Sequence, residues 1–296
     1  MRTIPNFFIV GAPKCGTTAW YEYLKGHPDI FFPEEKEPHF FSTDFPGLRA
    51  VTDRAEYFGL FDGHVREKIV GDASASYLYS NEAAANIRQH NPDSKILIFL
   101  RDQEAYLPSW HSQLLYSGTE DIRDFERAWA MSGSRHGVNV PRFYRELKLL
   151  DYKSVGRFSE QVRRYFDLFP REQIRVIHFR EWTCDPRAAY LNILNFLEVD
   201  DDGREDFPVF NEAKHHRTRF VVRFVRQPPR LVHKAVTLIK RATGRSGLGL
   251  ANLAFRLDTR AGMAGNISPS LAQEIREFYA SDNAMVEALI AGDIQA

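Results

Sequence analysis

Residues 6–24 read NFFIVGAPKCGTTAWYEYL, and this stretch decides the fold expected for the chain. The apolar, partly β-branched run Phe7–Val10 is typical of a strand that is buried on both faces. Glycine and proline then mark a turn, and Thr17 and Thr18 begin a helical pattern. The stretch therefore predicts a strand, a loop and a helix in direct succession.

The predicted loop has the features of an anion-binding site. Its backbone N–H groups, with the unpaired N–H groups and positive dipole end of the helix, attract a phosphate or sulfate group. Lys14 adds a full charge, and Thr17 and Thr18 have hydroxyl groups suited to capping the helix and binding phosphate oxygens. A nucleoside-triphosphate loop has its lysine directly after the second glycine, whereas Lys14 precedes Gly16.

The hexapeptide Pro13–Thr18, Pro-Lys-Cys-Gly-Thr-Thr, resembles the 5′-phosphosulfate loop of sulfotransferases that use 3′-phosphoadenosine 5′-phosphosulfate (PAPS). The family's common form has serine at the third position, so Cys15 is a mild departure where the backbone N–H does most of the binding. The resemblance implies that the donor is bound by Lys14, Cys15, Gly16, Thr17 and Thr18. The alternative is an ordinary turn in which Lys14 is a solvated surface charge.

A second segment, HPDIFFPEEKEPHFFS at residues 27–42, places charged residues between two Phe pairs. In an extended backbone, Glu37 and His39 point to one face and Lys36 points away. The order Glu-Pro-His-Phe-Phe resembles the segment of heparan-type and related bacterial sulfotransferases in which the glutamate is the catalytic base. The resemblance implies that Glu37 is the base and that His39 assists it. The alternative is a solvated loop held by its aromatic residues.

The clearest buried strand is Lys95–Leu100, and Arg101 follows it. Ligands of open α/β sheets bind beyond the carboxyl ends of the strands, so Arg101 is expected where an anion binds. An arginine at this place with Ser109 eight residues later resembles the 3′-phosphate site of PAPS enzymes, although Gln103 replaces the usual proline. The resemblance implies that Arg101 and Ser109 bind the 3′-phosphate.

The composition of the 296-residue chain is that of a globular protein with a formal net charge of zero. Nothing in this net charge indicates that the protein binds nucleic acid. Two cysteines, Cys15 and Cys184, do not make a disulfide framework and favour a reducing compartment. We find no transmembrane segment, signal peptide or metal-ligand spacing, and we expect a cytoplasmic, metal-independent protein.

A basic segment lies near the C-terminus. Residues 213–257 include no acidic residue. We expect residues 213–265 to form a basic, helical lid or insertion of a single domain that spans residues 1–296. The alternative is a surface that recruits an acidic acceptor or partner, or an anionic membrane.

Together, these patterns predict one α/β domain with a central, mainly parallel sheet of about five strands flanked by helices. The resemblance implies a sulfotransferase that moves the sulfuryl group from PAPS to a hydroxyl or amine of a small-molecule or glycan acceptor, leaving 3′-phosphoadenosine 5′-phosphate (PAP). Lys14 then stabilises charge on the leaving phosphate. Residues 72–77 lack the active-site lysine of the heparan type, so the acceptor stays open.

Two other functions remain open on the sequence. A P-loop-type nucleotide kinase or NTPase requires magnesium and a lysine that this loop does not place correctly. A non-catalytic nucleotide-binding module keeps Lys14, Arg101 and Ser109 but has no use for Glu37.

Overall fold

The computed structural model describes residues 4–135, 140–141, 144, 146–210 and 267–293, and the backbone of 214–216 and 259–261. Almost all of the predicted lid, residues 213–265, and of its basic segment lies outside the described residues. Among the described helices, none combines the length and the apolar character needed to cross a membrane.

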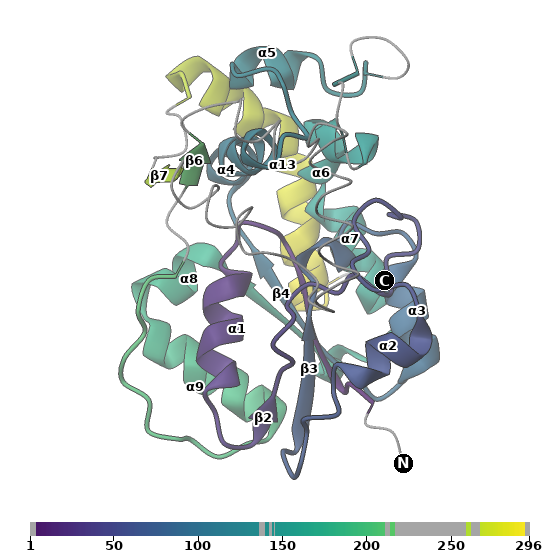
Figure 1. Ribbon diagram of the computed structural model, residues 1–296. Helices are drawn as coiled ribbons and strands as arrows, with labels where there is room; N and C mark the ends of the chain where they lie inside the picture. The colour runs from purple at the N-terminus through teal and green to yellow at the C-terminus, as the bar shows by residue number, and fades with distance from the viewer. Residues whose placement is uncertain are drawn as a thin grey trace, which may run out of the picture.

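Five parallel strands form the central sheet in the order β2-β3-β1-β4-β5. Their bounds are β1 Phe7–Gly11, β2 Ile30–Phe31, β3 Ile69–Ala73, β4 Lys95–Leu100 and β5 Ile174–His178. The side chains of Phe7, Phe8, Ile9 and Val10 on the central strand are fully buried, because helices lie on both sides of the sheet (Figure 1). The predicted α/β fold is confirmed.

The helices connect and cover these strands (Figure 1). Their bounds are α1 Thr17–Lys25, α2 Arg54–Gly59, α3 Ala83–His90, α4 Gln103–Ser117, α5 Phe125–Ala130, α6 Tyr152–Val155, α7 Phe158–Phe166, α8 Phe179–Cys184, α9 Pro186–Leu197 and α13 Pro269–Ala291. Short 3₁₀ turns are η1 Ala75–Tyr77, η2 Leu147–Leu150 and η3 Arg171–Gln173, and β6 Lys214–His216 pairs with β7 Thr259–Ala261 antiparallel.

The C-terminal helix α13 packs against α7 and α4. Its buried residues recur every three or four positions and give it one inward face: Leu271, Ile275, Tyr279, Asp282, Val286 and Leu289. The Asp282 carboxylate accepts hydrogen bonds from the backbone N–H groups of Phe158 (3.0 Å) and Ser159 (3.3 Å). A carboxylate at the N-terminus of α7 satisfies donors that the helix itself leaves unpaired.

A buried carboxylate organises the end of β3. Asp72 is fully buried and accepts hydrogen bonds from Ser74 Oγ (2.8 Å), Tyr57 Oη (2.9 Å) and Tyr77 Oη (2.9 Å). Burial raises the pKa of Asp72, although these three donors partly offset the effect. Burial also raises the pKa of both tyrosines far above the usual value, so their hydroxyl groups remain proton donors.

Replacing Asp72 by alanine leaves three buried hydroxyl groups without their acceptor. A buried group that loses its partner costs about 1–3 kcal/mol, so we expect Asp72→Ala to lower the free energy of unfolding by at least ~3 kcal/mol. Urea denaturation measures this loss. Asp62→Ala, which changes an exposed aspartate, is the control and should cost under ~0.5 kcal/mol; equal losses in the two variants would contradict the assignment.

Candidate active site

The loop after β1 depends on unusual backbone angles. Lys14 and Gly16 have φ of 64° and 92°, in the left-handed region that glycine tolerates best. A Cβ atom on Gly16 would lie 2.3 Å from Trp182 Cζ2 on α8, so only glycine allows this approach of α1 to α8. The predicted succession of strand, loop and helix is confirmed.

The helix begins differently from the prediction. Gly16 is the N-cap of α1, and a glycine has no side chain that could cap the helix. The prediction that Thr17 and Thr18 cap the helix was wrong, because the left-handed turn ends at Gly16 and both threonines lie inside the first helical turn. Their hydroxyl groups are thereby placed beside the helix N-terminus and line the cavity described next.

A cavity of about 960 Å³ lies at the carboxyl edge of the sheet. Residues that follow each of the five parallel strands line it, because these strands all end at this edge. Among its lining residues are eight of the nine candidates from the sequence: Lys14, Gly16, Thr17, Thr18, Glu37, His39, Arg101 and Ser109. The fold thus brings together residues that are far apart in the chain.

Cys15 is the candidate that does not line the cavity. Its side chain is fully buried, and burial raises the pKa of its thiol well above the usual value. The Cys15 backbone N–H donates to the carbonyl oxygen of Ala12 at 3.3 Å, inside the turn. A role for this N–H in anion binding stays a prediction.

Arg101 reaches back from the end of β4 toward the loop. Its Nη1 donates to the carbonyl oxygen of Lys14 at 3.4 Å, and its Cζ lies 4.4 Å from the centre of the Phe179 ring. Burial lowers the pKa of Arg101, but a guanidinium group stays charged in proteins. Ser109, on α4, lines the same cavity. Both residues are thus placed where the sequence predicted an anion.

The segment that contains Glu37 is not extended, so the side-chain directions expected for an extended backbone do not apply to it. Glu37 and His39 have φ of 62° and 51°, and Glu37 Oε2 lies 3.7 Å from His39 Nε2. Lys36 does not point away. Its Nζ donates to Thr18 Oγ1 at 2.9 Å and to Glu37 Oε1 at 3.3 Å, and it lines the cavity.

Three backbone donors hold this segment on the end of β3. The N–H of Glu37 donates to the carbonyl oxygen of Ala73 at 3.2 Å. The N–H groups of His39 and Phe41 donate to Ser74 Oγ (3.1 Å) and to Tyr77 Oη (3.3 Å). The serine and the tyrosine both bond Asp72, so this carboxylate fixes the backbone around Glu37.

The Glu37 carboxyl group is ionised at neutral pH. Burial acts to raise its pKa, but the nearby His39 ring and the positive charge of Lys36 outweigh that effect and lower the pKa to about 2. Its side chain is 42% exposed, so an acceptor can approach it. Glu37 therefore has the charge state of a general base, although so low a pKa makes it a weak one.

His111, on α4, is a structural residue. It does not line the cavity, and its Nε2 lies 2.8 Å from the carbonyl oxygen of Ile122. Its ring packs against Phe125 and Tyr152, and burial lowers its pKa. Glu37 and His39, by contrast, both line the cavity.

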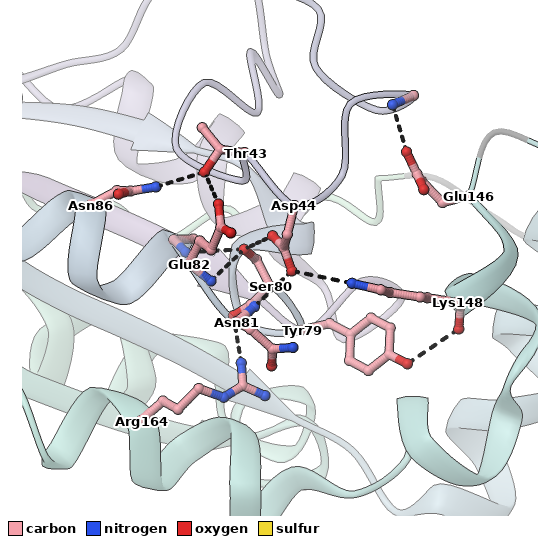
Figure 2. Close-up of polar contacts among 12 residues, drawn as sticks. Thr43, Asp44, Tyr79, Ser80, Asn81, Glu82, Asn86, Glu146, Lys148 and Arg164 are labelled. Carbon is pink, nitrogen blue, oxygen red and sulfur yellow. Dashed lines mark hydrogen bonds and ion pairs between the residues drawn. The ribbon is translucent and has the colours of Figure 1, made fainter.

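One part of the cavity wall includes Leu48, Leu149 and residues of α4. A polar network holds the segments on which the two leucines lie (Figure 2). Asp44 accepts from the backbone N–H of Asn81 at 3.0 Å and lies 3.7 Å from Lys148 Nζ. The backbone N–H of Gly47 donates to Glu146. These contacts fix the wall from outside the cavity.

Three residues of the site were missed by sequence reasoning: Lys36, Asp72 and Trp182. Asp72 had a visible signal, because a carboxylate within the apolar strand β3 requires buried partners. Lys36 had no such signal in the sequence. The direction of its side chain depends on left-handed backbone angles, which the alternation of side chains along a strand does not predict. The contact of Trp182 with Gly16 joins segments far apart in the chain.

The fold and the cavity define a protein of the α/β class with a P-loop-like loop after its first strand. The chain belongs to the sulfotransferase family, because the family model of the sulfotransferase domain matches residues 5–215. A solved sulfotransferase from Alicyclobacillus acidocaldarius is 31% identical, with a TM-score of 0.72, and the match covers 98% of this chain and 96% of that chain.

Curated relatives are more distant. Carbohydrate sulfotransferase 15 of Rattus norvegicus is 28% identical in an alignment of 273 residues that covers 74% of this chain and 48% of the relative. Heparan sulfate glucosamine 3-O-sulfotransferase 3B1 of Mus musculus is 25% identical over 214 residues, which are 72% of this chain and 51% of the relative. The chain spans about half the length of these relatives.

The contact between Gly16 and Trp182 can be tested by substitution. Gly16→Ala combines a strained φ with a clash against the indole ring, whereas Gly203→Ala changes a glycine with φ of +76° and no atom within 4 Å of its Cβ position. We expect Gly16→Ala to lower the free energy of unfolding by about 1–3 kcal/mol more than the control. Urea denaturation measures both losses. If the two variants lose the same free energy of unfolding, the positive φ explains the need for glycine at position 16, and the contact with Trp182 does not.

Proposed function

We propose that this protein transfers the sulfuryl group of PAPS to a hydroxyl or amine group of an acceptor, with Glu37 as the general base. The observation that carries the proposal is a single cavity that combines an anion-binding loop, three cations and a carboxylate. Among the described lining residues, the cations are Lys14, Lys36 and Arg101, and the carboxylate is Glu37. Membership of the sulfotransferase family supports PAPS as the donor.

The residues present fit such a donor. The cavity volume, about 960 Å³, suits a nucleotide together with an acceptor group. Lys14 and the N-terminus of α1 bind the 5′-phosphosulfate, and Arg101 and Ser109 bind the 3′-phosphate. His39 orients the acceptor or Glu37.

In the proposed reaction, the acceptor oxygen or nitrogen forms a bond to sulfur as the bond from sulfur to the 5′-phosphate oxygen breaks. The proton of the acceptor goes to the Glu37 carboxylate, and the electron pair of the broken bond stays on the phosphate oxygen of PAP. Lys14 stabilises that developing charge, which is a preorganised electrostatic contribution.

The relatives support a glycan as one acceptor class, because their names specify carbohydrate and heparan sulfate. A small-molecule acceptor fits the same chemistry. An acidic acceptor or partner at residues 213–257 and a cytoplasmic location stay predictions. A nucleotide kinase is not favoured, since Lys14 precedes Gly16 and the family model is that of sulfotransferases.

Nucleotide binding tests the donor. We expect calorimetric titration to show that PAP binds without magnesium and more tightly than ATP. Arg101→Ala removes a charge-assisted hydrogen bond worth about 1.5–3 kcal/mol. The affinity of the protein for PAP should therefore fall by roughly 10- to 100-fold. Affinity for adenosine 5′-phosphosulfate, which lacks the 3′-phosphate, should scarcely change.

Two results would argue against this assignment. Tight, magnesium-dependent ATP binding with no PAP binding would favour a kinase. Equal losses of PAP and adenosine 5′-phosphosulfate affinity in Arg101→Ala would show that Arg101 supports the loop and not the 3′-phosphate.

Glu37→Gln separates chemistry from binding, because an amide of nearly the same shape cannot accept the proton. We expect turnover of PAPS, measured with a panel of alcohols, phenols, amines and saccharides, to fall by about 10²–10⁴-fold, with PAP affinity close to wild type. His39→Ala should lower the turnover of PAPS by a smaller factor than Glu37→Gln does. Glu35→Gln, which changes an exposed neighbour, is the matched control; unchanged turnover in a folded Glu37→Gln protein would remove Glu37 from the mechanism.

A further inference from the structure

Lys36 lies between the two halves of the cavity. Its Nζ is 2.9 Å from Thr18 Oγ1, at the N-terminus of α1, and 3.3 Å from Glu37 Oε1. The Lys36 side chain is 19% exposed, and its Nζ lies 5.9 Å from the centre of the Tyr21 ring. One ammonium group thus contacts both the donor-binding helix and the carboxylate assigned as the base.

The chemistry of an ammonium group suits an exchange of partners. It has three donor hydrogens and a flexible four-carbon stem, so it can keep one hydrogen bond while it changes another. Thr18 is fixed by α1, whereas the Glu37 side chain is 42% exposed. An anion that binds at the N-terminus of α1 therefore competes with Glu37 for Lys36.

We propose that Lys36 is a further catalytic residue, which pairs with Glu37 before the donor binds and contacts a sulfuryl oxygen of PAPS during transfer. This role rests on the proposed function. Lys36 neither gains nor loses a proton: it stabilises negative charge on the sulfuryl oxygens while the acceptor atom bonds to sulfur, the bond from sulfur to phosphate breaks and Glu37 takes the acceptor proton.

The exchange also strengthens the base. The charged and titratable groups around Glu37 are Lys36 and His39 on its own segment, and Lys14 and Arg101 line the same cavity from the ends of β1 and β4. When Lys36 turns to the donor, Glu37 loses a positive charge that lowers its pKa. The carboxylate then accepts a proton more readily, and does so only with PAPS in place.

Binding of PAPS and PAP to Lys36→Met is the first test, because only PAPS has the sulfuryl group. We expect PAPS to bind at least about tenfold more weakly than to wild type, and PAP affinity to change less than about threefold. Lys25→Met is the matched control, since Lys25 also lies beside the Tyr21 ring, at 5.5 Å, and pairs with Glu34 outside the cavity. It should bind both nucleotides normally, and Lys36→Arg should restore most of the PAPS affinity.

The second test measures the Glu37 carboxyl group by NMR with ¹³C-labelled glutamate, assigned with Glu37→Gln. In the free wild-type protein the pKa should be about 2, and it should rise toward 4.5, the ordinary value, in Lys36→Met. PAPS should raise it in the wild type, and PAP should raise it less. The comparison of the two nucleotides needs no Lys36 variant, so it holds even if Lys36→Met does not fold.

The outcomes separate this proposal from the proposed function. If neither PAP nor PAPS binds the wild-type protein, the sulfotransferase assignment itself fails. If both bind, but Lys36→Met weakens them equally or not at all, Lys36 only joins α1 to the Glu37 segment. The same conclusion follows if PAPS leaves the pKa of Glu37 unchanged.

Discussion

The arrangement of the cavity depends on the buried carboxylate of Asp72. A carboxylate only accepts hydrogen bonds, so Ser74, Tyr57 and Tyr77 all direct their hydroxyl protons toward it. The oxygen atoms of Ser74 and Tyr77 are then available as acceptors for the backbone N–H groups of His39 and Phe41. One buried charge therefore joins the end of β3 to the segment that contains Glu37, and bonds in such a network reinforce one another.

The half of the site assigned to the donor could be predicted because its signals are local. The apolar runs of β1 and β4 and the glycines of the loop specify strands and a turn over a few residues each. Parallel strands end at one edge of the sheet, so Arg101 and the loop had to be neighbours once the fold class was known. The structure confirms the fold and brings Lys14, Arg101 and Ser109 into one cavity.

The half assigned to the acceptor could not be predicted in the same way. Left-handed backbone angles at Glu37 and His39 are unfavourable for residues other than glycine, and here long-range bonds maintain them. The partners of His39 and Phe41 lie 35 and 36 positions away in the chain. No local pattern encodes that pairing, so the rule of alternation in strands gave Lys36 the wrong direction. Residues 213–257 lie almost wholly outside the described part of the chain, so their predicted role stays a prediction.

The sharing of Lys36 connects these two halves energetically. Three cations and one carboxylate among the described lining residues leave the cavity positively charged before a donor binds, which favours an anionic nucleotide over a neutral acceptor as the first ligand. In that state Glu37 is a poor base, because its pKa of about 2 is far below neutral pH. The negative charge of the donor attracts the same ammonium group that weakens the base. Under this proposal, donor binding and activation of the acceptor are coupled through one side chain.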